Sequence, residues 1–114
     1  MKDVSLIIYP AADMTAAKRF FRELTGTDPY VDGAPYVGFK SGDMEIGLIP
    51  SEYARQPGAL PYWTVSDIAA SVKALEAAGG TVVQEITDVG YGMLVASVKD
   101  PNGSTVGLRQ PPKG

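Results

Sequence analysis

The chain contains neither cysteine nor histidine. The absence of cysteine excludes disulfide bonds and thiolate metal sites, and it is typical of a cytoplasmic protein. The absence of histidine excludes imidazole metal ligands, Ser-His and Cys-His nucleophile pairs, and the usual general base near neutral pH. Any catalysis by this chain must therefore use other side chains.

Long apolar runs and an excess of positive charge are also lacking. No segment is long and apolar enough to span a membrane, and Met1-Lys2-Asp3-Val4 does not begin a signal peptide. The net charge of −3 and the pI near 4.8 argue against nucleic-acid binding, which usually needs a basic face. No glycine-rich phosphate loop joins a strand to a helix. We expect a cytoplasmic protein that binds neither membranes nor nucleic acids.

The most informative feature present is an internal repeat within the 114 residues. Leu6 lies seven residues before Asp13, which opens an apolar-periodic run, and Leu60 lies seven residues before Asp67, which opens a similar run. Later, residues 46–48 recur as residues 106–108. A repeat of this kind predicts two copies of one structural unit.

Each copy reads as strand, helix and three strands. Asp13 and Asp67 are predicted N-caps, and glycines at 26 and 79–80 are predicted to end the two helices. We expect strands at 4–9, 30–31, 36–40 and 44–49, and again at 60–65, 81–85, 93–98 and 104–109. Pro10 is expected to end the first strand, and the tail from Gln110 is expected to be frayed.

The predicted fold class is α+β, with two tandem βαβββ modules that together form one domain. The first module is expected at residues 1–50 and the second at 60–114, joined by a linker at 51–59 rich in turn residues. Each module should be a curled mixed sheet with one helix, forming half of a barrel around a cavity. The sequence leaves open whether the halves close within one chain or pair across a dimer.

This pattern resembles the vicinal oxygen chelate superfamily, which includes glyoxalases, extradiol dioxygenases and bleomycin-resistance proteins. The most specific matching stretch is 98–108, which contains the turn Asp100-Pro101-Asn102-Gly103; weaker matches cover 65–80 and 13–26. The resemblance implies a metal bound through four positions, which in this chain are Leu6, Gly47, Leu60 and Gly107. None of these side chains can ligate a cation. We therefore expect no metal and no cofactor.

The resemblance also implies that these positions face a cavity, and strand alternation adds the residues two places away. Gly47 and Gly107 should leave room where metal-binding relatives carry carboxylates. Trp63 is expected on the helix side of its sheet, whereas for Tyr36 and Phe39 either face is open. The candidate ligand-binding residues are Leu6, Ile8, Glu45, Gly47, Leu60, Tyr62, Tyr91, Thr105, Gly107 and Arg109.

An apolar cavity with a few polar groups is the usual make-up of a small-molecule site. The first functional hypothesis is metal-independent binding or sequestration of a small organic molecule, which requires no catalytic group. The alternative is a metal-independent isomerase or lyase with Glu45 as general base. A third is an accessory subunit with a vestigial cavity. A homodimer is expected, because exposed sheet edges are usually covered by pairing.

Overall fold

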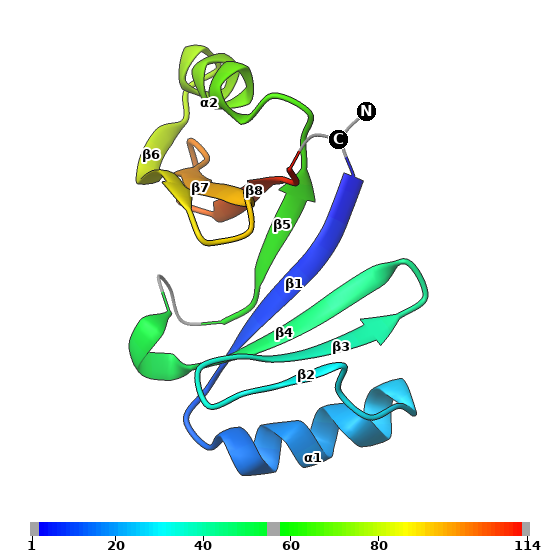
Figure 1. Cartoon of the computed structure of the whole chain (residues 1–114). Helices are drawn as coiled ribbons and strands as arrows, with labels where there is room; N and C mark the ends of the chain where they lie inside the picture. Colours follow the sequence, from blue (N-terminus) through cyan, green and yellow to red (C-terminus); the bar gives the residue numbers. More distant parts are fainter. Residues whose placement is uncertain (1–2, 55–57, 113–114) are drawn as a thin grey trace. The chain divides into compact units, whose positions relative to one another are not determined.

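The computed structural model describes residues 3–54 and 58–112, which form two compact units. The N-terminal unit spans Ser5–Leu60, and the C-terminal unit comprises Pro61–Gly114 together with Met1–Val4. In each unit a strand is followed by a helix and three further strands, so the predicted α+β fold with two tandem βαβββ repeats is confirmed (Figure 1).

The N-terminal unit is a mixed sheet with strands in the order β2-β3-β4-β1. Strand β1 runs parallel to β4, whereas the β3-β4 and β2-β3 pairs are antiparallel. A short 3₁₀ turn at Ser51–Tyr53, which the sequence did not predict, follows the last strand. The elements are β1 (Asp3–Ala11), α1 (Met14–Thr25), β2 (Val31–Asp32), β3 (Val37–Ser41) and β4 (Met44–Pro50).

The C-terminal unit repeats this arrangement with strands in the order β5-β8-β7-β6. Strand β5 is parallel to β8, and the β7-β8 and β6-β7 pairs are antiparallel hairpins. The elements are β5 (Leu60–Thr64), α2 (Ile68–Ala77), β6 (Thr81–Asp88), β7 (Leu94–Lys99) and β8 (Thr105–Gln110).

Both helices begin as the sequence predicts. The side chain of Asp13 accepts a hydrogen bond from the Ala16 amide at 3.0 Å, and Asp67 accepts one from Ala70 at the same distance. Each carboxylate thereby satisfies an amide that the first helical turn leaves without a partner. Helix α1 ends at Gly26, which adopts the left-handed conformation at φ 74°. No helix among the described residues has the length and hydropathy to cross a membrane.

Each helix packs on one face of its own sheet and forms a separate core. Beneath α1, the fully buried side chains of Phe39 and Leu48 pack with Phe21 and Val37. Beneath α2, the core consists of Val65, Ile68, Val72, Ala96 and Leu108. Because side chains alternate along a strand, the face turned away from each helix is also fixed by these contacts.

Two predictions about where ordered segments end were wrong. Strand β1 continues through Pro10, which pairs with Ile49, because a proline removes only one ladder donor and is tolerated where that donor is not needed. Gln110 is not frayed: it ends β8, and its side-chain oxygen accepts a hydrogen bond from the Ile68 amide at 2.8 Å. The start of α2 is therefore held by a residue 42 positions away.

Candidate functional site

Four of the predicted site residues share the face of the N-terminal sheet that is turned away from α1. Leu6 pairs with Glu45 and Ile8 pairs with Gly47 across the parallel β1-β4 ladder. Their neighbours Ile46 and Leu48 belong to the core under the helix. Alternation therefore places all four predicted residues on the opposite face.

On this face, tyrosine rings cover two adjacent glycines. Gly38 pairs with Gly47 across β3 and β4. A β-carbon added to Gly47 would lie 2.7 Å from the Tyr36 hydroxyl and 2.5 Å from Cδ1 of Ile8, and one added to Gly38 would lie 3.0 Å from the Tyr30 ring. The expectation that Gly47 leaves free room was wrong, because neighbouring side chains fill that room. Tyr36 thus lies on the face opposite Phe39, which is fully buried in the helix-side core.

Glu45 is held in place by a neighbour that is distant in sequence. The Tyr30 hydroxyl donates a short hydrogen bond to Oε1 of Glu45. Lys40, which pairs with Glu45 across the strands, places its ammonium nitrogen 5.0 Å from the centre of the Tyr30 ring. A cation at that distance is attracted to the face of an aromatic ring. The group combines the basic and acidic side chains of a β3-β4 pair with an aromatic side chain from the segment before β2.

The C-terminal sheet carries the corresponding group. Tyr62 pairs with Gly107, and Thr64 pairs with Arg109, on the face opposite Leu108 and the core under α2. Thr105 lies two residues before Gly107 and shares its face. A β-carbon on Gly107 would lie 2.7 Å from Cγ of Tyr62. Here too the expected room above the glycine is filled, in this case by the tyrosine ring itself.

Ser97 is a polar side chain on this same face that the sequence analysis did not single out. It pairs with Gly107 across the β7-β8 hairpin and has an exposed fraction of 0%. Its hydroxyl oxygen has no hydrogen-bond partner among the residues that the structure describes. Most buried hydroxyls in proteins are paired, so this one is unusual.

The remaining predicted residues are Leu60 and Tyr91. Leu60 is buried, opens β5 and shares the alternation of Tyr62. Tyr91 lies in the turn between β6 and β7 with a positive φ of 57° and a fully exposed side chain. Trp63 pairs with Leu108, which places it on the helix side as expected, although 38% of its surface remains exposed.

These residues do not fit a metal ion. Leu6, Gly47, Leu60 and Gly107 occupy the positions implied by the family resemblance, and none offers a side-chain donor. Tyrosine rings cover both glycines. Within residues 3–54 and 58–112, no three histidine, cysteine, aspartate or glutamate side chains gather closely enough to hold a metal.

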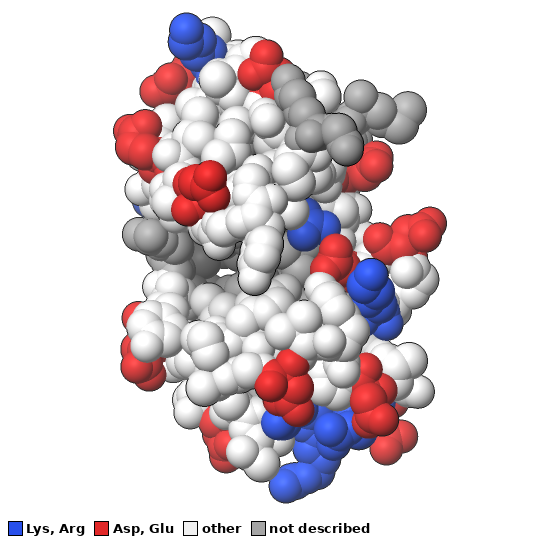
Figure 2. Space-filling view, in the orientation of Figure 1, with Lys and Arg blue, Asp and Glu red and all other residues white. Residues whose placement is uncertain are grey.

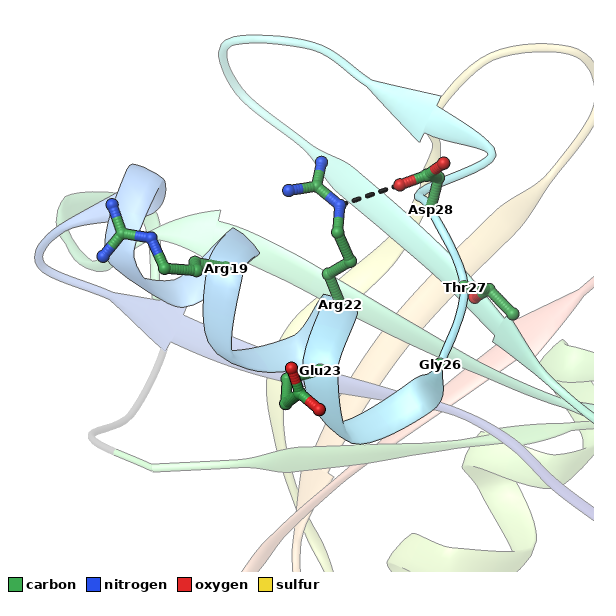
Figure 3. Close-up of a pocket in the computed structure, with 6 residues that line it drawn as sticks. All are labelled: Arg19, Arg22, Glu23, Gly26, Thr27 and Asp28. Atoms are coloured by element: carbon green, nitrogen blue, oxygen red, sulfur yellow. Dashed lines mark hydrogen bonds and ion pairs between the residues drawn. The ribbon is translucent and has the colours of Figure 1, made fainter.

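A depression of about 400 Å³ lies at the carboxyl-terminal end of α1 (Figure 3). Arg22 points toward Asp28 and forms an ion pair with it at 2.8 Å, whereas Arg19 points away from that pair. Figure 2 shows basic side chains gathered beside acidic ones over this helix. Paired charges on an exposed surface are typical of a solvated helix end, and we assign no site here. The depression is lined by Arg19, Arg22, Glu23, Gly26, Thr27 and Asp28.

Some of the missed residues carry a signal in the sequence and others do not. Counting outward from the Asp100–Gly103 turn pairs residue 99 with 105, and therefore Ser97 with Gly107. Tyr36 follows from alternation once Val37 is placed in the core. Tyr30 has no such signal, since its contact with Glu45 spans 15 residues and a loop.

Comparison with known proteins agrees with this architecture. The family model described as Glyoxalase/Bleomycin resistance protein/Dioxygenase superfamily matches residues 4–108. No curated protein matches the chain.

Solved structures match over nearly the whole chain. A hypothetical protein from Bacillus halodurans C-125 is similar with a TM-score of 0.78 and 12% identity, over 99% of this chain and 96% of that one. Methylmalonyl-CoA epimerase from Mycobacterium tuberculosis has a TM-score of 0.76 and 14% identity, over 96% and 88%. A superfamily member from Vibrio splendidus 12B01 has a TM-score of 0.73 and 17% identity, over 96% and 98%. These identities show a shared fold, and the family match shows that the chain belongs to the glyoxalase/bleomycin resistance protein/dioxygenase superfamily.

Proposed function

We propose that this protein binds a small, partly planar organic molecule reversibly and without a metal ion. The carrying observation is that tyrosine rings cover both glycines at the family's metal-ligand positions. Aromatic side chains give a planar ligand a stacking surface, and a few polar groups orient it. The proposed ligand-contacting residues remain those derived from the sequence, now joined by Tyr30, Tyr36 and Ser97.

Different parts of the ligand contact different side chains. Leu6, Ile8 and Leu60 provide apolar walls, Tyr91 provides a stacking surface, and the Tyr62 ring stacks on the ligand or rotates aside to admit it. Glu45, Thr105 and Arg109 orient polar groups of the ligand. Gly47 and Gly107 do not leave empty space; their lack of a side chain lets the Tyr36 and Tyr62 rings pack against the strand.

The test is a thermal-shift screen of aromatic natural products followed by calorimetry on each hit. Tyr36→Ala should weaken binding about fivefold or more, since truncating an aromatic hot-spot residue costs about 1 kcal/mol or more. Phe20→Ala is the matched control, because Phe20 lies on α1 and is 64% exposed. If Tyr36→Ala binds every hit as tightly as wild type, this face does not carry the site.

The absence of a metal is part of the proposal and has its own test. Elemental analysis of protein purified without chelator should find no stoichiometric zinc, nickel, manganese or iron. The reason is that the four ligand positions hold only leucine and glycine. One equivalent of any of these metals bound to the protein would contradict the proposal.

A metal-independent isomerase or lyase is the second candidate, with Glu45 as general base. It is favoured by the contact in which Tyr30 fixes the Glu45 carboxylate, because a general base needs a defined position. The similar fold of an epimerase is in keeping with this role. We rank it second because one carboxylate oxygen of Glu45 already accepts a hydrogen bond from the Tyr30 hydroxyl.

Deuterium exchange separates the two functions. Carbonyl-activated carbon acids, including acyl thioesters, are incubated with the protein in deuterated water and followed by NMR. A pure binding protein leaves exchange at the uncatalysed rate. Exchange that is accelerated by wild type and lost in Glu45→Gln would instead establish the enzyme.

We also propose that the protein is a cytoplasmic homodimer. Strand β6 has β7 as its one neighbour in the C-terminal sheet, and Val83 and Ile86 on it are each 39% exposed. Exposed edge strands are commonly covered by pairing. Light scattering at micromolar concentration should give about twice the chain mass of 12.0 kDa. A mass of one chain would contradict dimerisation.

A further inference from the structure

Three residues form a row across the C-terminal sheet on the face turned away from α2. Tyr62 on β5 pairs with Gly107 on β8, and Gly107 pairs with Ser97 on β7. Neighbours directly opposite each other in a sheet share a face. The glycine therefore separates an aromatic ring from a hydroxyl group without adding a side chain between them.

The Tyr62 ring covers the glycine in the middle of this row. A β-carbon at Gly107 would come within 2.7 Å of Cγ of the ring and closer still to two other ring atoms. The ring thus occupies the space that any other residue at 107 would use. A tyrosine side chain changes direction by rotation about χ1 between staggered rotamers, so the cover is movable without a change in the backbone.

Ser97, at the other end of the row, is the feature that ordinary packing does not explain. Its side chain is fully buried, and its hydroxyl has no partner in the described part of the chain. A buried hydroxyl without a partner is unfavourable, whereas a ligand oxygen or nitrogen at hydrogen-bond distance relieves that cost. The Ser97 end of the row therefore favours a ligand that has a polar atom able to bond to this hydroxyl.

We propose that Tyr62 is a displaceable cover over a polar subsite formed by Gly107 and Ser97, and that this subsite takes a phenol-like group. When the Tyr62 ring rotates away, a planar ring of similar size lies on the Gly107 backbone, and its hydroxyl bonds to the Ser97 hydroxyl. This subsite deepens the proposed function and rests on it, because it names the part of the ligand that the C-terminal sheet recognises.

The first experiment measures phenol and toluene binding by calorimetry and ligand-observed NMR. Tyr62→Ala should bind phenol at least about tenfold more tightly than wild type, since no covering ring must be displaced first. Adding Ser97→Ala to that variant should weaken phenol binding roughly fivefold and leave toluene unchanged, because only phenol bonds to the hydroxyl. Equal losses for phenol and toluene, or no gain from Tyr62→Ala, would overturn the proposal.

Controls keep the test independent of folding. Tyr62→Leu is a milder truncation that should show the same gain if Tyr62→Ala fails to fold. Tyr62→Phe retains the ring and should bind phenol as weakly as wild type. Ser71→Ala removes another buried serine of the same unit, on α2, and should leave phenol binding unchanged.

The second experiment needs no ligand. If the Ser97 hydroxyl is unpaired in the free protein, Ser97→Ala should leave the Tm unchanged or raise it, because it removes an unsatisfied polar group. A Tm lowered by several degrees would show that the hydroxyl is already bonded, and the subsite would be overturned. A screen that yields no natural ligand refutes the proposed function alone, since phenol binding and the Tm shift are measured separately.

Discussion

The two halves of the molecule place the same pattern on the sheet faces turned away from their helices but fill it differently. In the N-terminal sheet the row is Ile8, Gly47 and Gly38, and in the C-terminal sheet it is Tyr62, Gly107 and Ser97. In both, the side chain on the parallel strand, β1 or β5, leans over the glycine. The repeat therefore fixes the geometry of the face, and individual substitutions decide its chemistry.

The aromatic cover also comes from different places. In the N-terminal unit the glycines are covered by Tyr30, which precedes β2, and by Tyr36, which precedes β3. In the C-terminal unit the covering ring is that of Tyr62 on β5. The first arrangement leaves a carboxylate bonded to a tyrosine, and the second leaves a buried hydroxyl unpaired. The Glu45 carboxylate on the first face thus has a hydrogen-bond partner within its own unit, whereas the Ser97 hydroxyl on the second face has none among the described residues.

The largest expected difference between the halves lies in their cores. Phe39 is fully buried and Val98, at the corresponding position of the second repeat, is 2% exposed. Phe39→Ala should lower the free energy of unfolding by about 3–5 kcal/mol, because it leaves a large cavity. Val98→Ala should cost about 1–3 kcal/mol, since less apolar surface is lost. Urea denaturation followed by circular dichroism measures both, and equal losses would show that the two cores contribute alike.

The next difference concerns the covered glycines. In Gly107→Ala the new methyl group meets the base of the Tyr62 ring, whereas in Gly47→Ala it meets the far ends of Ile8 and Tyr36. Flexible ends move aside more easily, so Gly107→Ala should cost about 1–3 kcal/mol, the usual range for overpacking, and Gly47→Ala less. Thermal unfolding of both variants provides the measurement. A larger loss for Gly47→Ala would mean that the Tyr62 ring is the more mobile of the two covers.

A smaller difference is expected at the helix starts. Asp13→Ala should cost about 1 kcal/mol, the typical value for loss of an N-cap. Asp67→Ala should cost a few tenths less, because Gln110 still accepts from the Ile68 amide and the corresponding position after the first repeat is Pro50. The double variant Asp67→Ala with Gln110→Ala checks this in a mutant cycle. Strict additivity would show that the two contacts do not support each other.

The smallest effect should come from the exposed ion pairs that flank α1. Asp28 accepts from Arg22, and the two side chains are 84% and 47% exposed. Asp28→Asn should change stability by no more than about 0.5 kcal/mol, since solvent screens exposed pairs. Unfolding at low and high salt is the measurement. A loss above 1 kcal/mol would mean that this contact fixes the loop after the helix.

Local signals in the sequence determined the repeat, the order of elements and both helix caps. The caps are predictable because Asp13 and Asp67 act on amides three residues away. The sheet faces follow in part from alternation, which correctly separated Trp63 from Tyr62. The sequence also shows directly which residues occupy the family's four metal-ligand positions. They are leucines and glycines, whose side chains cannot bind a metal.

Tertiary structure alone decided what covers those positions. Glycine in a sequence indicates the absence of a side chain, but not which neighbour moves into the space, and packing density ensures that some neighbour does. Tyr36, Ile8 and Tyr62 fill it here. The partner of Glu45, the cap supplied by Gln110 and the isolation of the Ser97 hydroxyl depend likewise on contacts between distant segments. Those contacts exist only once the chain has folded, because loop closure and strand register bring their atoms together.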